Sequence, residues 1–245
     1  MQAIILAGGR GERLMPLTAD RPKCLVEVAG QPLIAHQLRW LAGQGVDRVV
    51  ISCGYEWRRI EAVVGDGAAF GLSVSYAVEE TPLGRGGGLR KALGQLRNES
   101  PRLPRRERAR VREAPVVACN GDVLTGLSLR PMVAQHRRSG AIATLLLAPF
   151  VSEHGVVDVD EQGRIGGFRE KPSLPYWLSG GVYVLSPEIQ RLLPRKGDHE
   201  TSTWPKLARA GRLQGYRYRG FWQPVDSAKD VREAERRLIG KSVLT

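Results

Sequence analysis

The chain has 245 residues, of which 42% are hydrophobic and 25% charged, and its formal net charge is +12. This length is sufficient for one α/β domain with a buried core. Its apolar runs, such as 3–7 and 141–147, are far shorter than the stretch of about 20 apolar residues that a transmembrane helix needs, so we expect no membrane partner.

Strand and helix patterns alternate along the first half of the chain. Strands are predicted over 2–7, 46–52, 73–78 and 115–119, and helices over about 31–45, 55–65 and 86–97. Such alternation implies parallel strands joined by crossover helices. We therefore predict an α/β fold with a doubly wound, mainly parallel, Rossmann-like sheet that binds ligands at its carboxyl edge.

A basic stretch interrupts this pattern at 97–113, where seven arginines and two prolines accompany three glutamates. A basic surface can attract nucleic acid. This stretch has no aromatic residue that could stack on a base, so we interpret it as a solvated insertion and expect no nucleic-acid partner. Contact with another polyanion or with a partner is the alternative.

The pattern changes after about residue 150. Short strands are predicted around 155–159, 164–168 and 181–185, and a final helix over about 228–239. No repeat or low-complexity linker separates this part from the rest of the chain. We expect a single domain over 1–245, with a first half at about 1–150 and a smaller mixed lobe at about 151–245 that covers the site.

The cysteines indicate a reducing environment. Cys24, Cys53 and Cys119 are odd in number and scattered, and no C-x-x-C pair is present in the sequence. This spacing argues against a disulfide framework and against a structural zinc site. The N-terminus has no basic head followed by a cleavage site, so we expect a cytoplasmic protein.

The most informative motif follows the first strand. Gly8, Gly9 and Gly11 form a glycine loop, and the cations Arg13 and Lys23 come after it. Because glycine has no Cβ, such a loop can turn tightly and aim successive N–H groups at anionic oxygens. The sequence thus predicts a phosphate-binding loop.

Two better known glycine loops do not fit this motif. A dinucleotide-binding fingerprint needs a third glycine where this chain has Leu14. The triplet Gly240-Lys241-Ser242 has Glu235 where a P-loop needs its first glycine.

Further motifs follow the glycine loop in a recognisable order. They are Thr81-Pro82-Leu83-Gly84 with Gly86 to Gly88, Asn120-Gly121-Asp122, Glu170-Lys171-Pro172, Gly180-Gly181-Val182-Tyr183 and Phe221 to Asp226. Over nearly the whole chain this series resembles the sugar-1-phosphate nucleotidyltransferases, also called nucleotide-sugar pyrophosphorylases. Some members of that family carry a C-terminal β-helix, and we expect no such domain here.

The resemblance implies an enzyme that transfers a nucleotidyl group from a nucleoside triphosphate to a sugar 1-phosphate, with Mg²⁺ as cofactor and pyrophosphate as second product. Arg13 is then expected on the β- and γ-phosphates and Lys23 near the α-phosphate, with Asp122 and Lys171 as further catalytic residues. The nucleotide-binding set implied by the family comprises Leu6, Ala7, Gly8, Gly9, Gly11, Glu79, Pro82, Gly84 and Gly121.

Two carboxylates are expected to hold the magnesium ion. Asp122 follows a predicted strand and Asp226 precedes the final helix, and Mg²⁺ prefers hard oxygen ligands. Each aspartate alone could instead be a turn or cap residue. Many family members read W-x-D-I-G, whereas this chain has Pro224 in place of that aspartate, so the Phe221-to-Asp226 run resembles the glucose-1-phosphate cytidylyltransferases and Asp226 takes the role.

The family also implies a sugar site. Lys171 would hold the phosphate of the sugar and Glu170 its hydroxyls, while Gly155 would let the backbone approach. Ser179 stands where the family often has asparagine, which leaves the identity of the sugar open.

The substrate pair is open between several members of the family. The run from Glu79 to Gly88 resembles mannose- or heptose-1-phosphate guanylyltransferases, and Glu79 could accept the N–H donors of guanine. We therefore expect guanylyl transfer, with uridylyl, thymidylyl or cytidylyl transfer as the alternatives. A non-catalytic nucleotide-sugar sensor is the alternative from another class, and a homo-oligomer is an open option.

Overall fold

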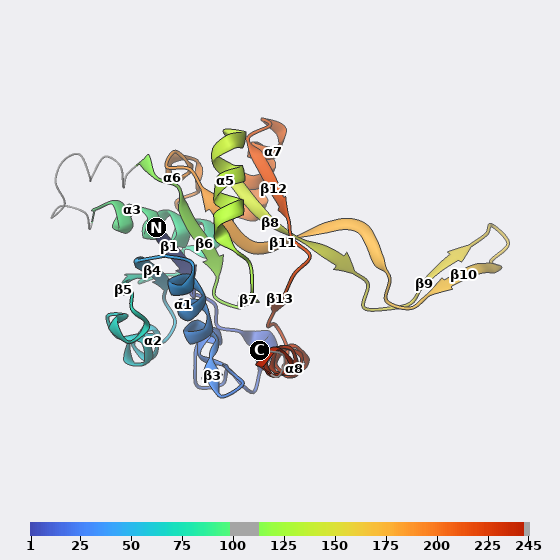
Figure 1. Cartoon of the computed structure of the whole chain (residues 1–245), viewed down its shortest axis with the longest axis horizontal. Helices are drawn as coiled ribbons and strands as arrows, with labels where there is room; N and C mark the ends of the chain where they lie inside the picture. The colour runs from blue at the N-terminus through green and yellow to red at the C-terminus, as the bar shows by residue number, and fades with distance from the viewer. Residues whose placement is uncertain (99–112, 243–245) are drawn as a thin grey trace.

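The computed structural model describes residues 1–98 and 113–242 (Figure 1). The solvated insertion predicted at 97–113 falls, apart from its first two residues and its last, outside the described residues.

A seven-stranded sheet crosses the molecule in the order β12-β8-β11-β6-β1-β4-β5. Its strands are β1 (Gln2–Leu6), β4 (Arg48–Cys53), β5 (Ser73–Val78), β6 (Val116–Asn120), β8 (Ala143–Val151), β11 (Ser173–Leu185) and β12 (Leu213–Arg217). Parallel pairs join β1 to β4, β1 to β6, β4 to β5 and β12 to β8, whereas β11 runs antiparallel between β6 and β8. The predicted mainly parallel, doubly wound sheet is confirmed.

Helices pack on both faces of the sheet. The first face contacts α1 (Leu33–Gly43), α2 (Trp57–Val64) and α5 (Leu129–Ser139), and the second α3 (Gly84–Asn98), α6 (Ile189–Leu192) and α7 (His199–Arg209). Successive residues of β1 point to opposite faces of the sheet: Ile5 packs in the hydrophobic core on the first face and Ile4 in the core on the second. A strand that is buried on both faces has a continuous run of apolar residues, and this run is the pattern that predicted β1.

A third, smaller core fixes the C-terminal segment beside the sheet. Helix α8 (Ala228–Ser242) packs Ala234 against Leu33 and Leu124. Next to it, β13 (Trp222–Pro224) pairs antiparallel with β7 (Val123–Thr125). The remaining short elements are β2 (Glu27–Val28), β3 (Gln31–Pro32) and the 3₁₀ turns Glu12–Leu14, Lys23–Leu25 and Ala68–Phe70.

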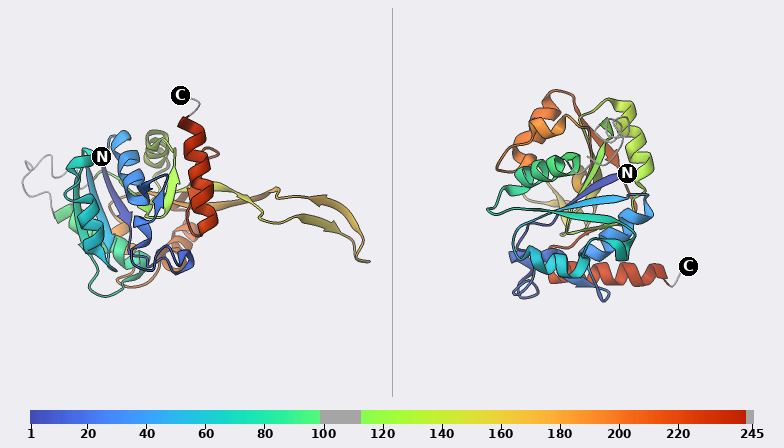
Figure 2. Two further views of the ribbon diagram at one scale, coloured as in Figure 1. Left: turned by 90° about the horizontal axis from the view of Figure 1, so that it is seen from below. Right: turned by 90° about the vertical axis from the view of Figure 1, so that its left-hand side faces the viewer.

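The second half of the chain differs from the predicted covering lobe. Strand β11 is 13 residues long, against the five predicted at 181–185, and together with β8 it extends beyond the sheet. At its end β9 (Val156–Val159) and β10 (Ile165–Arg169) form a hairpin that points away from the body in two views (Figures 1 and 2). We refer to residues 151–178 as the arm.

The amino-acid composition of β11 does not predict its full length. Pro175, Gly180 and Gly181 are poor strand residues, and the pairing with β8 shifts register around each of them. The apolar run Leu145 to Pro149 nevertheless supplies a partner strand, so cross-strand pairing overrides the local preference. No helix of the described residues is long and apolar enough to cross a membrane.

Candidate functional site

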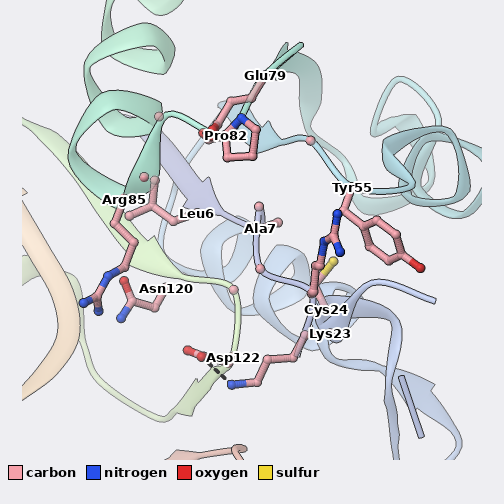
Figure 3. A pocket seen from close by; sticks show the side chains of 18 of the residues that line it. Leu6, Ala7, Lys23, Cys24, Tyr55, Glu79, Pro82, Arg85, Asn120 and Asp122 are labelled. Carbon is pink, nitrogen blue, oxygen red and sulfur yellow. Dashed lines mark hydrogen bonds and ion pairs between the residues drawn. The ribbon is translucent and has the colours of Figure 1, made fainter. Parts of the chain in front are cut away.

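The site lies where four strands end. Because β1, β4, β5 and β6 are mutually parallel in the sheet, their carboxyl ends share one edge. A cavity of about 620 Å³ opens at this edge (Figure 3). It is lined by Leu6, Ala7, Gly8, Gly9, Arg10, Lys23, Cys24, Ser52, Gly54, Tyr55, Glu79, Glu80, Pro82, Gly84, Arg85, Gly88, Asn120, Gly121 and Asp122.

The glycine loop is held in a tight turn beneath this cavity. Gly11 has φ +73°, and a Cβ there would lie 2.9 Å from the Cβ of Lys23 and from a methyl group of Thr18. The Thr18 hydroxyl donates to the carbonyl of Gly11 at 2.8 Å. On the other side the N–H of Gly121 donates to the carbonyl of Leu6 at 2.8 Å, so the loop is joined to the end of β6. Only glycine fits these approaches.

A chain of four charges lies beside the loop. The Lys23 ammonium contacts Oδ2 of Asp122 at 2.6 Å and Oδ1 of Asp226 at 2.5 Å. The guanidinium of Arg13 donates to the same Oδ1 of Asp226 at 2.8 Å. The Lys23 side chain is only 13% exposed, so its two ion pairs are less screened by water than the pair of the exposed Arg13. Residues 13, 23, 122 and 226, which sequence motifs singled out separately, form one cluster.

The cluster depends on how the C-terminal segment is placed. The ladder between β13 and β7 puts Pro224 opposite Val123, and the N–H of Val225 donates to the carbonyl of Asp122 at 2.9 Å. The two aspartates are thereby aligned although they lie far apart in the sequence. Pro224, which precedes Val225 and Asp226, is part of this ladder.

The opposite end of the cavity is formed by the segment after β5. In Figure 3, Glu79 and Pro82 lie across the cavity from Lys23 and Asp122. Oε2 of Glu79 accepts from the N–H of Leu83 at 2.8 Å, and Oε1 accepts from the Ser52 hydroxyl at 3.2 Å. Each oxygen of Glu79 therefore has a protein partner, which anchors the turn that carries Pro82.

Sequence reasoning did not assign Arg85, Arg10 or Tyr55 to the site, and all three line the cavity. Arg85 is held by Asp198 at 2.5 Å and Glu200 at 2.8 Å. The guanidinium of Arg10 lies 5.2 Å from the ring centroid of Tyr55, a cation–π distance. Tyr55 follows β4 at the same sheet edge as the glycine loop, and the parallel-sheet rule alone could have identified it.

Two cysteines are sequence neighbours of residues in the site, Cys24 of Lys23 and Cys119 of Asn120. Cys24 and Cys119 are buried, as is Cys53 at the end of β4. Burial raises the pKa of each of these three thiols to about 12. All three are therefore neutral thiols at physiological pH, in keeping with the absence of a disulfide pattern in the sequence.

The predicted sugar-binding residues do not gather at the cavity of their own chain. Ser179 lies at the sheet edge opposite Leu147. Gly155, Glu170 and Lys171 lie on the arm, where a Cβ on Gly155 would be 3.2 Å from Oε2 of Glu170. Lys171 is exposed and has φ +45°, a left-handed conformation unusual for a residue with a side chain.

Fold and sequence together define the class. The nucleotidyl transferase family model matches residues 2–240, and the chain belongs to this family. The family resemblance inferred from the motifs is thus confirmed.

Curated relatives are about a third identical to this chain over the aligned residues. It is 32% identical to the mannose-1-phosphate guanylyltransferase of Mycobacterium tuberculosis over 238 residues, and 32% identical to the probable mannose-1-phosphate guanylyltransferase 2 of Arabidopsis thaliana over 240 residues. Each alignment covers 94% of this chain, which spans 62% and 63% of those relatives' lengths.

Solved structures share the fold. The crystal structure of HddC from Yersinia pseudotuberculosis complexed with GMP-PN has a TM-score of 0.71 at 21% identity and is covered to 99%, with 97% of this chain matched. A putative glucose-1-phosphate thymidylyltransferase from Bacillus anthracis has a TM-score of 0.70 at 23% identity, with 97% of this chain and 94% of that chain covered.

Proposed function

We propose that this protein transfers a nucleotidyl group from a nucleoside triphosphate to a sugar 1-phosphate, and that the preferred reaction is guanylyl transfer to a mannose- or heptose-type sugar. The observation that carries this proposal is the charged cluster of Arg13, Lys23, Asp122 and Asp226 at one end of a nucleotide-sized cavity. The names of the curated relatives favour guanine and mannose.

The proposed reaction needs no general base. The sugar phosphate is a monoester with a second pKa near 6, so its oxygen is already ionised near neutral pH. This oxygen attacks the α-phosphorus, a new P–O bond forms, and the bond to the β-phosphate breaks with release of pyrophosphate. The protein has to bring two polyanions together and stabilise the charge that develops on the leaving group.

The cations divide this task between them. Arg13 can contact the β- and γ-phosphates because its guanidinium is mostly exposed beside the glycine loop. Lys23 lies between loop and carboxylates, within reach of an α-phosphate in the cavity. The backbone N–H groups of the glycine loop supply further hydrogen-bond donors to the phosphates, and no bulky side chain blocks their approach.

The two aspartates fit a magnesium ion. They already hold the ammonium of Lys23 between them, a cation at the position where their oxygens converge. Among the described residues no group of three or more His, Cys, Asp or Glu could hold a metal, but Mg²⁺ usually takes one or two carboxylates and completes its shell with phosphates and water. Asp122 and Asp226 would hold the ion, which when bound neutralises phosphate charge.

A matrix of the four nucleoside triphosphates against mannose, heptose and glucose 1-phosphates tests the proposal, with pyrophosphate release as readout. We expect the highest kcat/KM for GTP with a mannose- or heptose-type 1-phosphate, and loss of turnover when EDTA removes divalent ions. Nucleotide binding without pyrophosphate release from any pair would overturn the proposal and favour a sensor.

A further inference from the structure

The arm has an apolar face that is largely exposed to solvent. Val157 pairs with Phe168, and Val159 with Ile165, so these four side chains share one face of the hairpin. Phe168 is 65% exposed and Ile165 62%. Seven of the eleven large apolar residues that are exposed among the described residues belong to the arm.

The opposite face of the same hairpin is polar. Arg169 pairs with Asp158 at 3.0 Å, and Arg164 pairs with Asp160 at 2.8 Å near the turn. A two-stranded hairpin alone is at best marginally stable in water. An amphipathic hairpin with one bare apolar face is typical of an interaction surface.

The arm is held away from its own cavity. Strands β8 and β11 stay paired as far as Val151 and Ser173. The guanidinium groups of Arg217 and Arg219 lie 5.3 and 5.2 Å from the ring centroid of Trp177. From Ser179 to its first residue, Ser173, β11 covers six residues, a reach of about 20 Å at about 3.3 Å per residue, and Lys171 lies two residues further along the arm.

The cavity, in turn, has its cations already engaged. Lys23 and Arg85 are each held by two carboxylates, and Arg10 lies over the ring of Tyr55. A second polyanionic substrate requires a further cation. Lys171, exposed and held with Glu170 at the base of the hairpin, is the residue that the family motif assigns to the sugar's phosphate.

We propose that two copies of this chain form a two-fold dimer in which the arm of each lies across the cavity of the other and supplies Lys171 and Glu170 in trans. This inference rests on the proposed function and specifies how its sugar site is completed. Each copy has one arm and one cavity, so a two-fold axis satisfies both at once.

Three properties of the arm fit a second copy. The arm carries five acidic and three basic residues in a chain of net charge +12, so it is electrostatically complementary to the body of an identical chain. Met15 and Leu17, exposed beside Arg13, provide an apolar rim for its apolar face. Its 28 residues match the about 20–30 that one side of a stable interface contributes.

Molar mass in solution tests the dimer. Light scattering on the wild-type chain should give twice the chain mass of 26.9 kDa. The double variant Ile165→Thr/Phe168→Thr removes the two most exposed apolar side chains of this face and puts β-branched residues in their place, so it should be a folded monomer. The matched control Asp158→Asn/Arg169→Gln changes the polar face of the same strands and should stay a dimer with unchanged activity.

Mixing two inactive variants tests the exchange of arms. Asp122→Asn disables the cavity and Lys171→Ala disables the arm. After unfolding and refolding together, half of the dimers should be mixed, and each has one intact site, so activity should recover to about a quarter of the wild-type value. Each variant refolded alone should stay inactive.

The outcomes separate the dimer from the function. A wild-type monomer with full activity, a dimer whose mixed variants recover nothing, or an unimpaired Lys171→Ala variant would each overturn the exchange of arms and leave nucleotidyl transfer standing. A dimer that releases pyrophosphate from no substrate pair would instead overturn the proposed function.

Discussion

The ammonium of Lys23 and the carboxylate of Asp122 lie 2.6 Å apart, at the junction of the glycine loop and the end of β6. The two residues come from opposite ends of the first half of the chain, and the pair exists because β1 and β6 are neighbours in the sheet. Asp226 extends it into a three-charge arrangement around one nitrogen.

Replacing Asp122 by asparagine should therefore abolish most of the activity. The amide is neutral, so the negative charge that attracts the cation is lost, and we expect turnover to fall by at least about 100-fold. Steady-state pyrophosphate release, with a melting curve to show that the fold is intact, measures this. Asp20→Asn, at an exposed carboxylate paired with Arg21, serves as control. A folded Asp122→Asn variant of near-normal activity would contradict the assignment.

Arg13 should act through its geometry as well as its charge. Arg13→Ala should lower kcat/KM by about 100-fold or more, because a charge-assisted contact with the leaving pyrophosphate is lost. Arg13→Lys should restore only part of this, since lysine lacks the planar fork. Complete rescue by lysine would show that net charge alone matters.

Gly88 should be essential for nucleotide affinity. A Cβ at this position would lie 2.4 Å from Oε1 of Glu79 and 2.7 Å from the Ser52 hydroxyl, so alanine must displace the carboxylate that anchors the turn. We expect Gly88→Ala to raise KM for the triphosphate by about 10-fold or more and to lower stability by about 1–3 kcal/mol.

Gly94→Ala is the matched control for Gly88→Ala, since it lies in the same helix and its Cβ would meet only the end of the Gln190 side chain at 3.0 Å. Alanine is the better helix former by about 1 kcal/mol, so this variant should keep both KM and stability. Equal KM values for the two variants would show that the Glu79 anchor is not needed for nucleotide binding.

His199 should make stability depend on pH. Its ring is buried between Tyr183 and Trp204, and neither ring nitrogen has a hydrogen-bond partner in the described structure. Burial lowers its pKa to about 4. An unfolded histidine titrates near 6.5, so as pH falls the unfolded chain takes up the proton first. Stability is retained above pH 6.5 and lost between about pH 6.5 and 4.

His199→Phe should remove this dependence while keeping the aromatic packing. Between pH 7 and 4.5 the free energy of unfolding of the variant should fall by about 2 kcal/mol less than that of the wild type, as measured in urea titrations. Parallel declines in the two proteins would show that other groups dominate acid unfolding.

Much of the fold and of the charged cluster was predictable from local pattern. Buried strands such as 2–6 and 116–120 have continuous apolar runs. The glycine loop is followed in the sequence by the cations that were expected to bind phosphate with it. Asp226 could be placed beside Asp122 only through the motif order, because the ladder between β7 and β13 leaves no periodic signal in three-residue strands.

The arm could not be predicted in the same way. Its direction is set by tertiary contacts, in particular the cation–π contacts of Trp177 with Arg217 and Arg219, which lie about 40 positions further along the chain. Motif order placed Lys171 with the cavity, and it contains no information on whether that cavity belongs to the same copy.

The three buried thiols have a consequence for how the protein responds to its surroundings. Cys24 and Cys119 adjoin Lys23 and Asn120, yet a thiol with a pKa of about 12 presents almost no thiolate to alkylating agents, peroxide or soft metal ions near neutral pH. Near neutral pH the region around the carboxylates therefore offers oxygen ligands but no reactive thiolate, and reagents that inactivate cysteine-dependent enzymes should leave the proposed nucleotidyl transfer unchanged.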